Sequence, residues 1–472
     1  MNRYKKLFSD TAAFTISNFA SKILVFLLIP LYTSFLTTEE YGIADLITNT
    51  VNVIYPLLTL CIMEATLRFT FDNGVCKEEV LFNSLFVITL GEIVALLIIP
   101  FVRSLNSEIY EYWPWFAVIL LGFNLQQVIS QYTKGIGKTR LFAISGVVQT
   151  ATIIAVNIVG LLFLHWGLFA YLLAIALGYY GTALFLILTV PIRIKKPHLN
   201  VTLMRDMLNF SIPTIPTVIA WWISTSADKY IIIAYWGIVA SGIYSVAYKI
   251  PSILTLFSNI FTSAWTISAM QWVDDKGNIA FQSTVYNYFN IINVLACGVL
   301  ILFSQTLAKV LFSNDFYTAW HYVPLRLVAY VFSGLAGFMA SSFRAAKYTK
   351  GLFSSTVIGA VTNIILNFFF VKAFGNMGAA FTTMIGFAVT FYIRSHSIKK
   401  VVDLKINLAK DTFAYALLFA MAMVISFEIP GSYFIGMAIF ATLIILYLRD
   451  IKYLLLKIAG ILEKIIAGSK VK

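Results

Sequence analysis

Charged residues are scarce in this sequence, and a few of them fall inside long apolar stretches. Lys22 and Lys249 each lie midway along such a stretch, one in each half of the chain. A charged side chain at bilayer depth costs several kcal/mol unless it faces a cavity or a partner, so it is a candidate for function. Lysine holds a phosphate as a point charge, and this attraction strengthens at low dielectric constant. We therefore predict that Lys22 and Lys249 project into one central cavity and hold an anionic group.

Other ionisable residues lie in or beside the same stretches. Arg68 would extend the basic path to the inner mouth of the cavity, and Asp45, Glu64 and Glu92 are the groups available to titrate within the membrane. The alternative is a structural role, in which the lysines snorkel to the interface or pair with these carboxylates. A structural role is the one we expect for Glu92 and Arg326.

Aromatic and proline residues mark the same region. Trp221 and Trp222 follow Pro216 and could stack against sugar rings, although an interfacial aromatic belt explains them as well. Prolines inside membrane helices bend them and are tolerated beside a cavity. Five prolines fall within the expected spans: Pro30, Pro56, Pro213, Pro216 and Pro251.

No motif for metal, nucleotide or redox chemistry is recognisable. The four histidines and three cysteines are scattered without the spacing that metal ligands need. Gly137-Lys138-Thr139 resembles the end of a phosphate loop, but Tyr132 stands where that loop needs its first glycine. We therefore expect no metal, no cofactor and no ATP site.

The elements that carry these residues are predicted to be membrane-spanning helices. The 472 residues are 60% hydrophobic and 12% charged, which excludes a soluble enzyme, a nucleic-acid-binding protein and a secreted disulfide scaffold. The apolar runs are long enough for transmembrane helices of about 20 residues and too continuously apolar for barrel strands. The sequence thus predicts an all-α polytopic membrane protein with about fourteen spans, at 12–36, 42–66, 80–102, 113–132, 141–164, 166–190, 208–228, 238–268, 281–304, 320–343, 351–371, 374–393, 411–428 and 431–448.

The basic residues predict how these spans are oriented. Most of the 34 Lys and Arg fall on one side of the spans, and such residues are retained in the cytoplasm. Both termini are therefore predicted to be cytoplasmic. The loops are too short for a soluble catalytic domain, and residues 449–472 have the amphipathic pattern of a helix that lies on the inner leaflet.

A weak internal repeat divides the chain. A shift of 210 positions superposes Thr139 on Thr349 and Asn157 on Asn367. The match relates spans that are six apart, so both copies would insert in the same orientation, as in parallel repeats of transporters. We expect a six-helix lobe at 1–195, a second at 205–395, two extra transmembrane helices at 411–448 and a cytoplasmic amphipathic tail at 449–472.

Four stretches carry a family resemblance: Phe14-Thr15-Ile16-Ser17-Asn18-Phe19 through Lys22, Leu36-Thr37-Thr38-Glu39-Glu40-Tyr41-Gly42, Ser226-Ala227-Asp228-Lys229-Tyr230, and Ser241-Gly242-Ile243-Tyr244-Ser245-Val246-Ala247-Tyr248-Lys249. With them the whole chain resembles the Wzx-type polysaccharide flippases of the multidrug/oligosaccharidyl-lipid/polysaccharide (MOP) superfamily. The resemblance implies a fold like that of the MATE and MurJ transporters.

The resemblance also implies a function. Such a protein is a transporter and not an enzyme, and it carries an undecaprenyl-diphosphate-linked oligosaccharide from the inner to the outer leaflet of the bacterial cytoplasmic membrane by alternating access. The cargo would be an O-antigen, capsule or exopolysaccharide repeat unit. The implied partners are the lipid bilayer, a polysaccharide polymerase and a chain-length regulator, with no nucleic acid. The cationic role in the cavity falls on Lys22 and Lys249.

Two other functions stay open at this point. A drug/cation antiporter of the same superfamily would need a predominantly acidic cavity, whereas the two mid-span lysines favour an anionic cargo. A membrane polysaccharide polymerase or glycosyltransferase would need a large loop that carries carboxylates or histidines. The short loops of this chain argue against such an enzyme.

Overall fold

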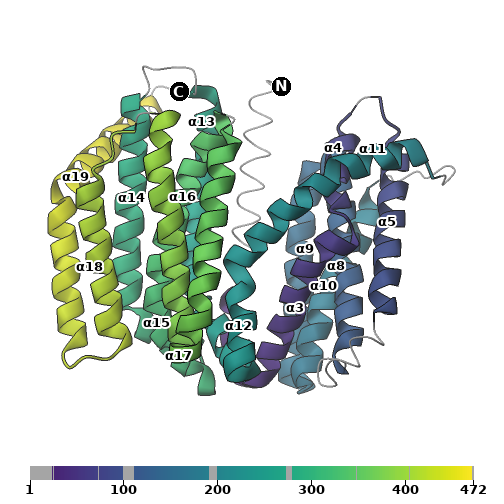
Figure 1. Ribbon diagram of the computed structural model, residues 1–472, viewed down its shortest axis with the longest axis horizontal. Coiled ribbons are helices and arrows are strands. Elements are labelled where there is room, and N and C mark those ends of the chain that lie inside the picture. The colour runs from purple at the N-terminus through teal and green to yellow at the C-terminus, as the bar shows by residue number, and fades with distance from the viewer. Residues whose placement is uncertain are drawn as a thin grey trace. The chain divides into compact units, whose positions relative to one another are not determined.

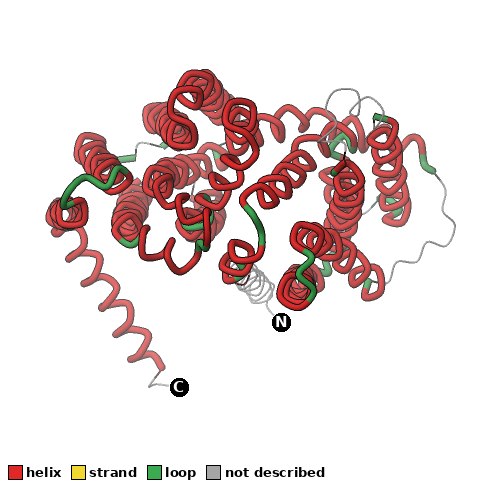
Figure 2. Tube along the Cα trace, turned by 90° about the horizontal axis from the view of Figure 1, so that it is seen from below, coloured by secondary structure: helices red, strands yellow, loops and turns green. Residues whose placement is uncertain are grey.

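The computed structural model describes residues 24, 26–72, 74–98, 111–190, 199–272, 279–346, 348–402 and 404–469. Over these ranges the chain forms helices joined by short turns and contains no strand (Figure 2). Nine of the described helices are long and apolar enough to cross a membrane, or ten if the bent pair α3 (Thr38–Leu58) and α4 (Ile62–Thr70) counts as one span. The predicted all-α polytopic membrane fold is confirmed.

The chain divides into two compact units. The first comprises Met1–Ser226 with Ser313–Asp315, and the second comprises Ala227–Phe312 with Phe316–Lys472. Long helix α12 begins in the first unit and continues into the second.

Seven further helices accompany α3 and α4 in the first unit, together with the short segment η2. These are α2 (Ile29–Phe35), α5 (Lys77–Leu97), α8 (Trp113–Gly135), α9 (Thr139–Asn157), the π-helical η1 (Ile158–Phe163), α10 (Gly167–Thr189), α11 (Val201–Ser211) and the 3-10 turn η2 (Ile212–Thr214). Apolar side chains from α4, α5, α8, α10 and α11 form the core. The core contains Ile62, Leu81, Ile129 and Leu186, which are all almost fully buried.

A capping box starts α3 and fixes it to a neighbour. The Thr37 hydroxyl accepts the Glu40 N–H at 3.1 Å, and the Glu40 carboxylate accepts the Thr37 N–H at 2.8 Å. These bonds satisfy N–H groups that a helix start leaves without partners. The second Glu40 oxygen accepts the N–H of Leu168 at 3.2 Å, so one carboxylate also joins α3 to the beginning of α10.

The second unit is a helical bundle around one buried helix. Its members are α13 (Pro251–Trp272), α14 (Ile279–Leu302), α15 (Ser304–Leu311), α16 (Val323–Ala345), α17 (Thr349–Ser397), η5 (Ile398–Lys400), α18 (Leu408–Ser426) and α19 (Ser432–Ser469), with the later part of α12 (Ile215–Ala247) and most of η4 (Asn314–Tyr322). Helix α16 packs against α13, α14, α17 and α18 (Figure 1). Its most apolar 18-residue window is 83% buried.

Two glycines reverse the backbone inside helices α12 and α17. Gly237 has φ +80° and Gly375 has φ +55°, conformations that favour glycine because it lacks a Cβ atom. Each reversal joins two helical segments through a single residue. The reversals also contact each other, because the Trp236 indole donates to the Val371 carbonyl at 2.7 Å and the Asn376 amide donates to the Ala240 carbonyl at 2.8 Å.

Prolines stand mainly at helix starts. Pro30 lies in the first turn of α2, Pro216 is the second residue of α12, and Pro251 is the first residue of α13. Proline is favoured there because its missing N–H would have no acceptor within the helix. Each of these three prolines thus follows a helix break inside its predicted span, at Leu28, between α11 and α12, and between α12 and α13, whereas Pro56 lies inside α3.

One predicted span begins too early. The sequence predicts a span at 208–228, but α11 ends at Ser211, the turn η2 follows, and α12 begins at Ile215. Pro213 lies in η2, where it ends the first helix. Each of the other predicted spans from residue 42 onward overlaps a helix of the structure.

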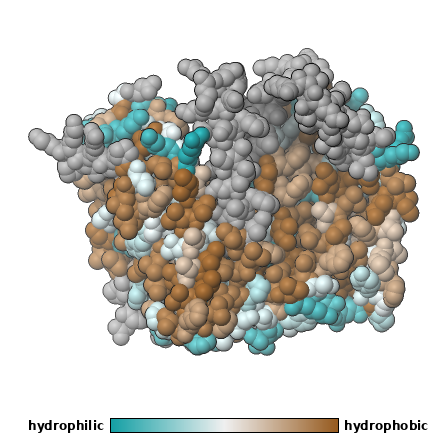
Figure 3. Space-filling model, turned by 180° about the vertical axis from the view of Figure 1, so that it is seen from behind, coloured by the Kyte–Doolittle hydropathy of each residue, from teal (hydrophilic) through white to brown (hydrophobic). Residues whose placement is uncertain are grey.

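The surface of the helices matches a lipid environment. In Figure 3 hydrophobic side chains cover the sides of the helices, and hydrophilic side chains gather toward the helix ends. Large apolar residues are exposed along the spans, including Leu97 at 73%, Leu188 at 75% and Phe434 at 73%. An apolar exposed surface of this extent is expected where the solvent is hydrocarbon.

Candidate functional site

A buried ion pair lies in the second unit. Asp228 of α12 and Arg326 of α16 are 3% and 2% exposed, and the Arg326 Nη2 atom lies 3.7 Å from the Asp228 Oδ2 atom. Charged groups this deeply buried are retained only when they are paired and hydrogen-bonded. The pair therefore marks a position where α12 and α16 must meet in one arrangement.

Hydroxyl and aromatic groups complete the surroundings of this pair. The Tyr244 hydroxyl donates to Asp228 at 2.7 Å, and the Thr383 hydroxyl donates to the same oxygen at 3.3 Å. Arg326 donates to the Tyr244 carbonyl at 3.2 Å and stands 4.0 Å from the centre of the Tyr244 ring. The Tyr248 ring is 5.6 Å from the guanidinium. Helices α12, α16 and α17 thus supply one neutral polar cluster.

Lys249 lies beside this cluster, at the break between α12 and α13. Residues 248–250 form a turn, in which the Lys249 N–H donates to the Val246 carbonyl at 2.9 Å and the Lys249 carbonyl accepts the Ser252 hydroxyl at 2.5 Å. The Lys249 side chain is half-buried. The ring of its neighbour Tyr248 contacts the ring of Tyr330 of α16, with 5.4 Å between centroids. The residue before Lys249 therefore contacts α16.

A small polar cavity continues along α13 and α16. It has a volume of about 50 Å³ and is lined on α16 by Tyr330, Ser333, Gly334 and Gly337 and on α13 by Thr255, Ser258, Asn259 and Thr262. A water molecule needs about 10–15 Å³ measured in this way and several polar partners, so this cavity can hold a few waters. Hydroxyl and amide groups that line a membrane-embedded cavity are suited to hydrogen-bond sugars or water.

The polar groups extend further along the same face of α16. The Thr266 hydroxyl meets the Ser341 hydroxyl at 2.7 Å, and Arg344 donates to Ser341 at 3.4 Å. We call Arg326, Tyr330, Ser333, Gly337, Ser341 and Arg344 the polar seam, because spacings of three or four residues place them on one face of α16.

Arg394 of α17 closes the far end of this region. Its guanidinium donates to the Ser355 hydroxyl at 3.0 Å, to the Ala336 carbonyl at 2.8 Å and to the Thr356 hydroxyl at 2.8 Å. The side chain is buried, and the three bonds hold α16 and both halves of α17 together. Two buried arginines, Arg326 and Arg394, therefore tie α16 to its neighbours α12 and α17.

The first unit contains the predicted carboxylates and Arg68. Glu92 of α5 is 8% exposed, and its Oε2 atom has no hydrogen-bond partner among the described residues. Asp45 is half-buried on α3 and Glu64 is exposed on α4. Arg68 is exposed and forms an ion pair with Asp72 four residues later, so its charge is partly compensated. Glu92 is therefore the predicted carboxylate with the clearest unsatisfied group.

Some of the predicted residues cannot be placed. Lys22 lies outside the described residues, as does the side chain of Trp221. Trp222 is half-buried on α12 and belongs to the first unit with Arg68, whereas Lys249 belongs to the second. The pairing of Lys22 with Lys249 thus stays a prediction. Among the side chains that the structure does describe, no three His, Cys, Asp or Glu gather to hold a metal ion.

Sequence reasoning missed several members of this region. Tyr244, Thr383 and Arg394 were not candidates, and Asp228 and Arg326 were expected at the outer ends of their spans. A signal was nevertheless readable: the seam residues recur at helical spacing within an otherwise apolar span.

Comparison with solved structures defines the class of protein. The fold matches the lipid II flippase MurJ in an inward closed conformation with a TM-score of 0.72 and 16% identity, over 93% of this chain and 99% of that one. It also matches an inward-facing MATE multidrug resistance transporter of the MOP superfamily with a TM-score of 0.68 and 16% identity, over 80% of this chain and 95% of that one. The chain thus shares the fold of these two transporters.

The family follows from the sequence match. Residues 7–271 match the family described as polysaccharide biosynthesis protein, and this chain belongs to that family. The resemblance to the polysaccharide flippases of the MOP superfamily, predicted from the sequence, is confirmed at the level of family and fold.

Two curated relatives are archaeal. One is the probable low-salt glycan biosynthesis flippase Agl15 of Haloferax volcanii, 23% identical over 54% of this chain and 56% of its own length. The other is the uncharacterised membrane protein MJ1375 of Methanocaldococcus jannaschii, 23% identical over 84% of this chain and 98% of its own length. The match to Agl15 therefore spans little more than half of that protein.

Proposed function

We propose that this protein is a flippase that carries a polyprenyl-diphosphate-linked oligosaccharide from the inner to the outer leaflet of the cytoplasmic membrane by alternating access. The family, the name of the Haloferax relative and the MurJ-like fold support a flippase. The observation that carries the proposal for a glycan cargo is the polar seam with its hydroxyl-lined cavity. Sugars need hydrogen-bonding groups, whereas the cationic cargo of an antiporter would need carboxylates, and none of the seam residues is a carboxylate.

Lys249 is proposed to contact the diphosphate. It is half-buried at the break between α12 and α13, and the residue before it contacts Tyr330 of the seam. An ammonium group in a low-dielectric site attracts phosphate strongly. We propose Lys22 as the matching cation of the other lobe, with Arg68 toward the inner mouth and Trp221 and Trp222 stacking on sugar rings.

Glu92 is proposed to couple transport to an ion gradient. Its Oε2 atom is buried and lacks a partner among the described residues, so a proton or a cation would satisfy it. Asp45 and Glu64 are more exposed and remain secondary candidates. An undecaprenyl carrier, a polymerase and a chain-length regulator as partners belong to the same proposal, as do a bacterial inner membrane and cytoplasmic termini.

A vesicle assay tests the proposal directly. The purified protein is reconstituted into vesicles with a fluorescent lipid-linked oligosaccharide, and crossing is measured with and without a pH gradient. Loss of one charged contact to phosphate is worth about 1.5–3 kcal/mol, so Lys249→Ala is expected to slow crossing about tenfold or more. Lys249→Arg should retain most of the rate, because the charge remains.

A control variant and a coupling variant complete the assay. Lys309→Ala removes an exposed lysine from the short helix α15 and should leave the rate unchanged. Glu92→Gln should abolish the response to the pH gradient while leaving downhill crossing intact. Full transport by Lys249→Ala at normal abundance would refute the role of Lys249. Drug efflux without glycan crossing would assign the protein to the antiporters.

A further inference from the structure

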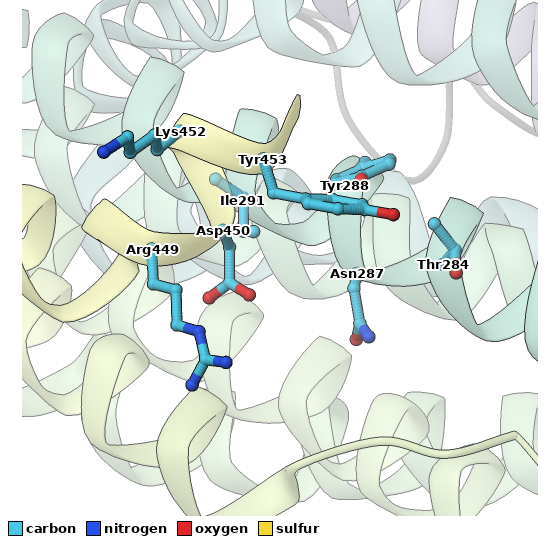
Figure 4. A pocket seen from close by; sticks show the side chains of 8 residues that line it. All are labelled: Thr284, Asn287, Tyr288, Ile291, Arg449, Asp450, Lys452 and Tyr453. Atoms are coloured by element: carbon cyan, nitrogen blue, oxygen red, sulfur yellow. The ribbon is translucent and has the colours of Figure 1, made fainter. Parts of the chain in front are cut away.

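A pocket opens between α14 and α19, away from the polar seam. It has a volume of about 340 Å³ (Figure 4). Its lining includes Thr284, Asn287 and Tyr288 from α14, and Arg449, Lys452 and Tyr453 from α19. Cationic, hydroxyl and amide groups thus face one space from two helices.

The cations of this pocket are in excess over its carboxylate. Asp450 also lines the pocket, but its carboxylate accepts the Lys410 ammonium of α18 at 2.6 Å. Arg449 and Lys452 are exposed and remain as positive charges that Asp450 does not balance. The pocket therefore favours an anionic ligand, and a guanidinium with neighbouring hydroxyl groups fits the oxygens of a phosphate.

A buried hydrogen-bond network holds the pocket walls in place. The Tyr447 hydroxyl donates to Asp411 at 2.9 Å, the Asn290 amide donates to the Tyr447 hydroxyl at 3.5 Å, and the Tyr415 hydroxyl donates to the Asn290 carbonyl oxygen at 2.8 Å. These four residues come from α14, α18 and α19. The two helices that line the pocket are thus connected directly beneath it, and the cavity is formed before a ligand binds.

The position of the pocket suits a lipid headgroup. The uncharged apolar run of α19 ends at Leu448 in the sequence, and Arg449, Asp450 and Lys452 are the first charged residues after it, as expected where a helix leaves the hydrocarbon. One to two turns deeper, Ile445 and Leu448 are 70% and 56% exposed and offer a surface for acyl chains. Cations at the boundary with apolar side chains below them are the arrangement that anionic lipids require.

We propose that this pocket binds the phosphate headgroup of an anionic glycerophospholipid from the leaflet in which the span of α19 ends. Arg449 and Lys452 hold the phosphate, and Asn287 and Thr284 hydrogen-bond the remaining polar groups of the headgroup. The proposal does not depend on the transport function, because the pocket lies on α14 and α19 and the proposed glycan site lies on α13 and α16. Free phosphate and the diphosphate of a lipid carrier share this chemistry, so the experiment must separate these sources.

The test compares lipids on the full-length protein in detergent, with binding followed by native mass spectrometry and thermal melting. Phosphatidylglycerol is expected to bind and to raise the melting temperature, and phosphatidylcholine at the same concentration is expected to do so much less. The double variant Arg449→Ala/Lys452→Ala should weaken phosphatidylglycerol binding about tenfold or more. The matched control Lys399→Ala/Lys400→Ala removes two exposed lysines of η5 and should bind as the unmodified protein does.

Three outcomes would overturn the proposal. The first is equal binding of phosphatidylglycerol by the double variant and the unmodified protein, with the variant folded as judged by its melting. The second is displacement of the lipid by millimolar inorganic phosphate, which would make the site one for free anions. The third is displacement by far lower concentrations of undecaprenyl diphosphate, which would make it a loading site for the carrier. None of these results alters the outcome of the vesicle crossing assay with Lys249→Ala.

Discussion

The buried pair of Asp228 and Arg326 gives the sharpest quantitative prediction. Removing one partner of a buried, hydrogen-bonded ion pair leaves the other charge uncompensated, which costs about 3–5 kcal/mol. Both side chains are at most 3% exposed, so solvent screening does not reduce this figure. We therefore expect Asp228→Asn and Arg326→Met each to lower the free energy of unfolding by about 3–5 kcal/mol.

The double variant separates this charge effect from a loss of packing. Asp228→Asn keeps an amide that can bond Tyr244 and Thr383, and Arg326→Met keeps most of the side-chain volume. With both charges gone, no uncompensated ion remains, so the double variant should be less destabilised than the sum of the singles by about 2–3 kcal/mol. Unfolding by SDS titration of the purified protein measures all four states, with Lys309→Gln as the surface control.

Additive losses would refute this reasoning. If the double variant lost the sum of the single effects to within about 0.5 kcal/mol, the two charges would be energetically independent. The 3.7 Å separation between Asp228 and Arg326 would then reflect proximity without a stabilising interaction between the two charges.

Three further predictions concern packing within each of the two units. Each is measured by thermal or SDS unfolding. Arg394→Lys should lower the free energy of unfolding by about 3 kcal/mol, because an ammonium cannot reproduce three guanidinium hydrogen bonds in separate directions. An unchanged unfolding midpoint would contradict this. Gly359→Ala should destabilise by about 1–3 kcal/mol, since the added Cβ atom would clash with Thr390 and with the Gly386 carbonyl in the second half of α17. The Cβ atom added by Gly146→Ala would contact nothing within 4 Å, so this variant should be neutral or stabilising. Equal losses of stability at the two glycines would contradict the steric argument. Glu40→Ala removes the capping box and the bond to α10 and should lower the free energy of unfolding by about 1–2 kcal/mol. The control Glu39→Ala, at an exposed position, should change it by no more than about 0.5 kcal/mol. Similar effects of both variants would show that the cap contributes little.

The helices themselves could be predicted from the sequence for a physical reason. Hydrocarbon offers backbone groups no partner, so a long apolar run must satisfy its own N–H and C=O groups as a helix. The runs at 281–304 and 411–428 accordingly coincide with α14 and α18 to within a few residues. The start of α12 was harder to predict, because the residues before it are apolar enough to continue the span. Only Pro213 and Pro216 mark the boundary.

The site was less predictable because its geometry is tertiary. Asp228 and Arg326 are almost a hundred residues apart, and nothing local in either span indicates that the two side chains meet. Lys249 could be singled out because a lysine in an apolar run is unusual by itself. Arg394 gave no such signal, since an arginine close to the end of a span is usually interfacial, and only its three buried hydrogen bonds show otherwise.

The single-residue reversal at Gly375 has a consequence for how the protein is made. With one residue between the two halves of α17, the connection is too short to remain outside the bilayer while the second half is synthesised. The segments 349–374 and 376–397 must therefore enter the membrane together as a closed hairpin. Any side chain larger than glycine at position 375 would hinder that turn, and the damage would be seen as loss of inserted protein during biosynthesis before any effect on transport could be measured.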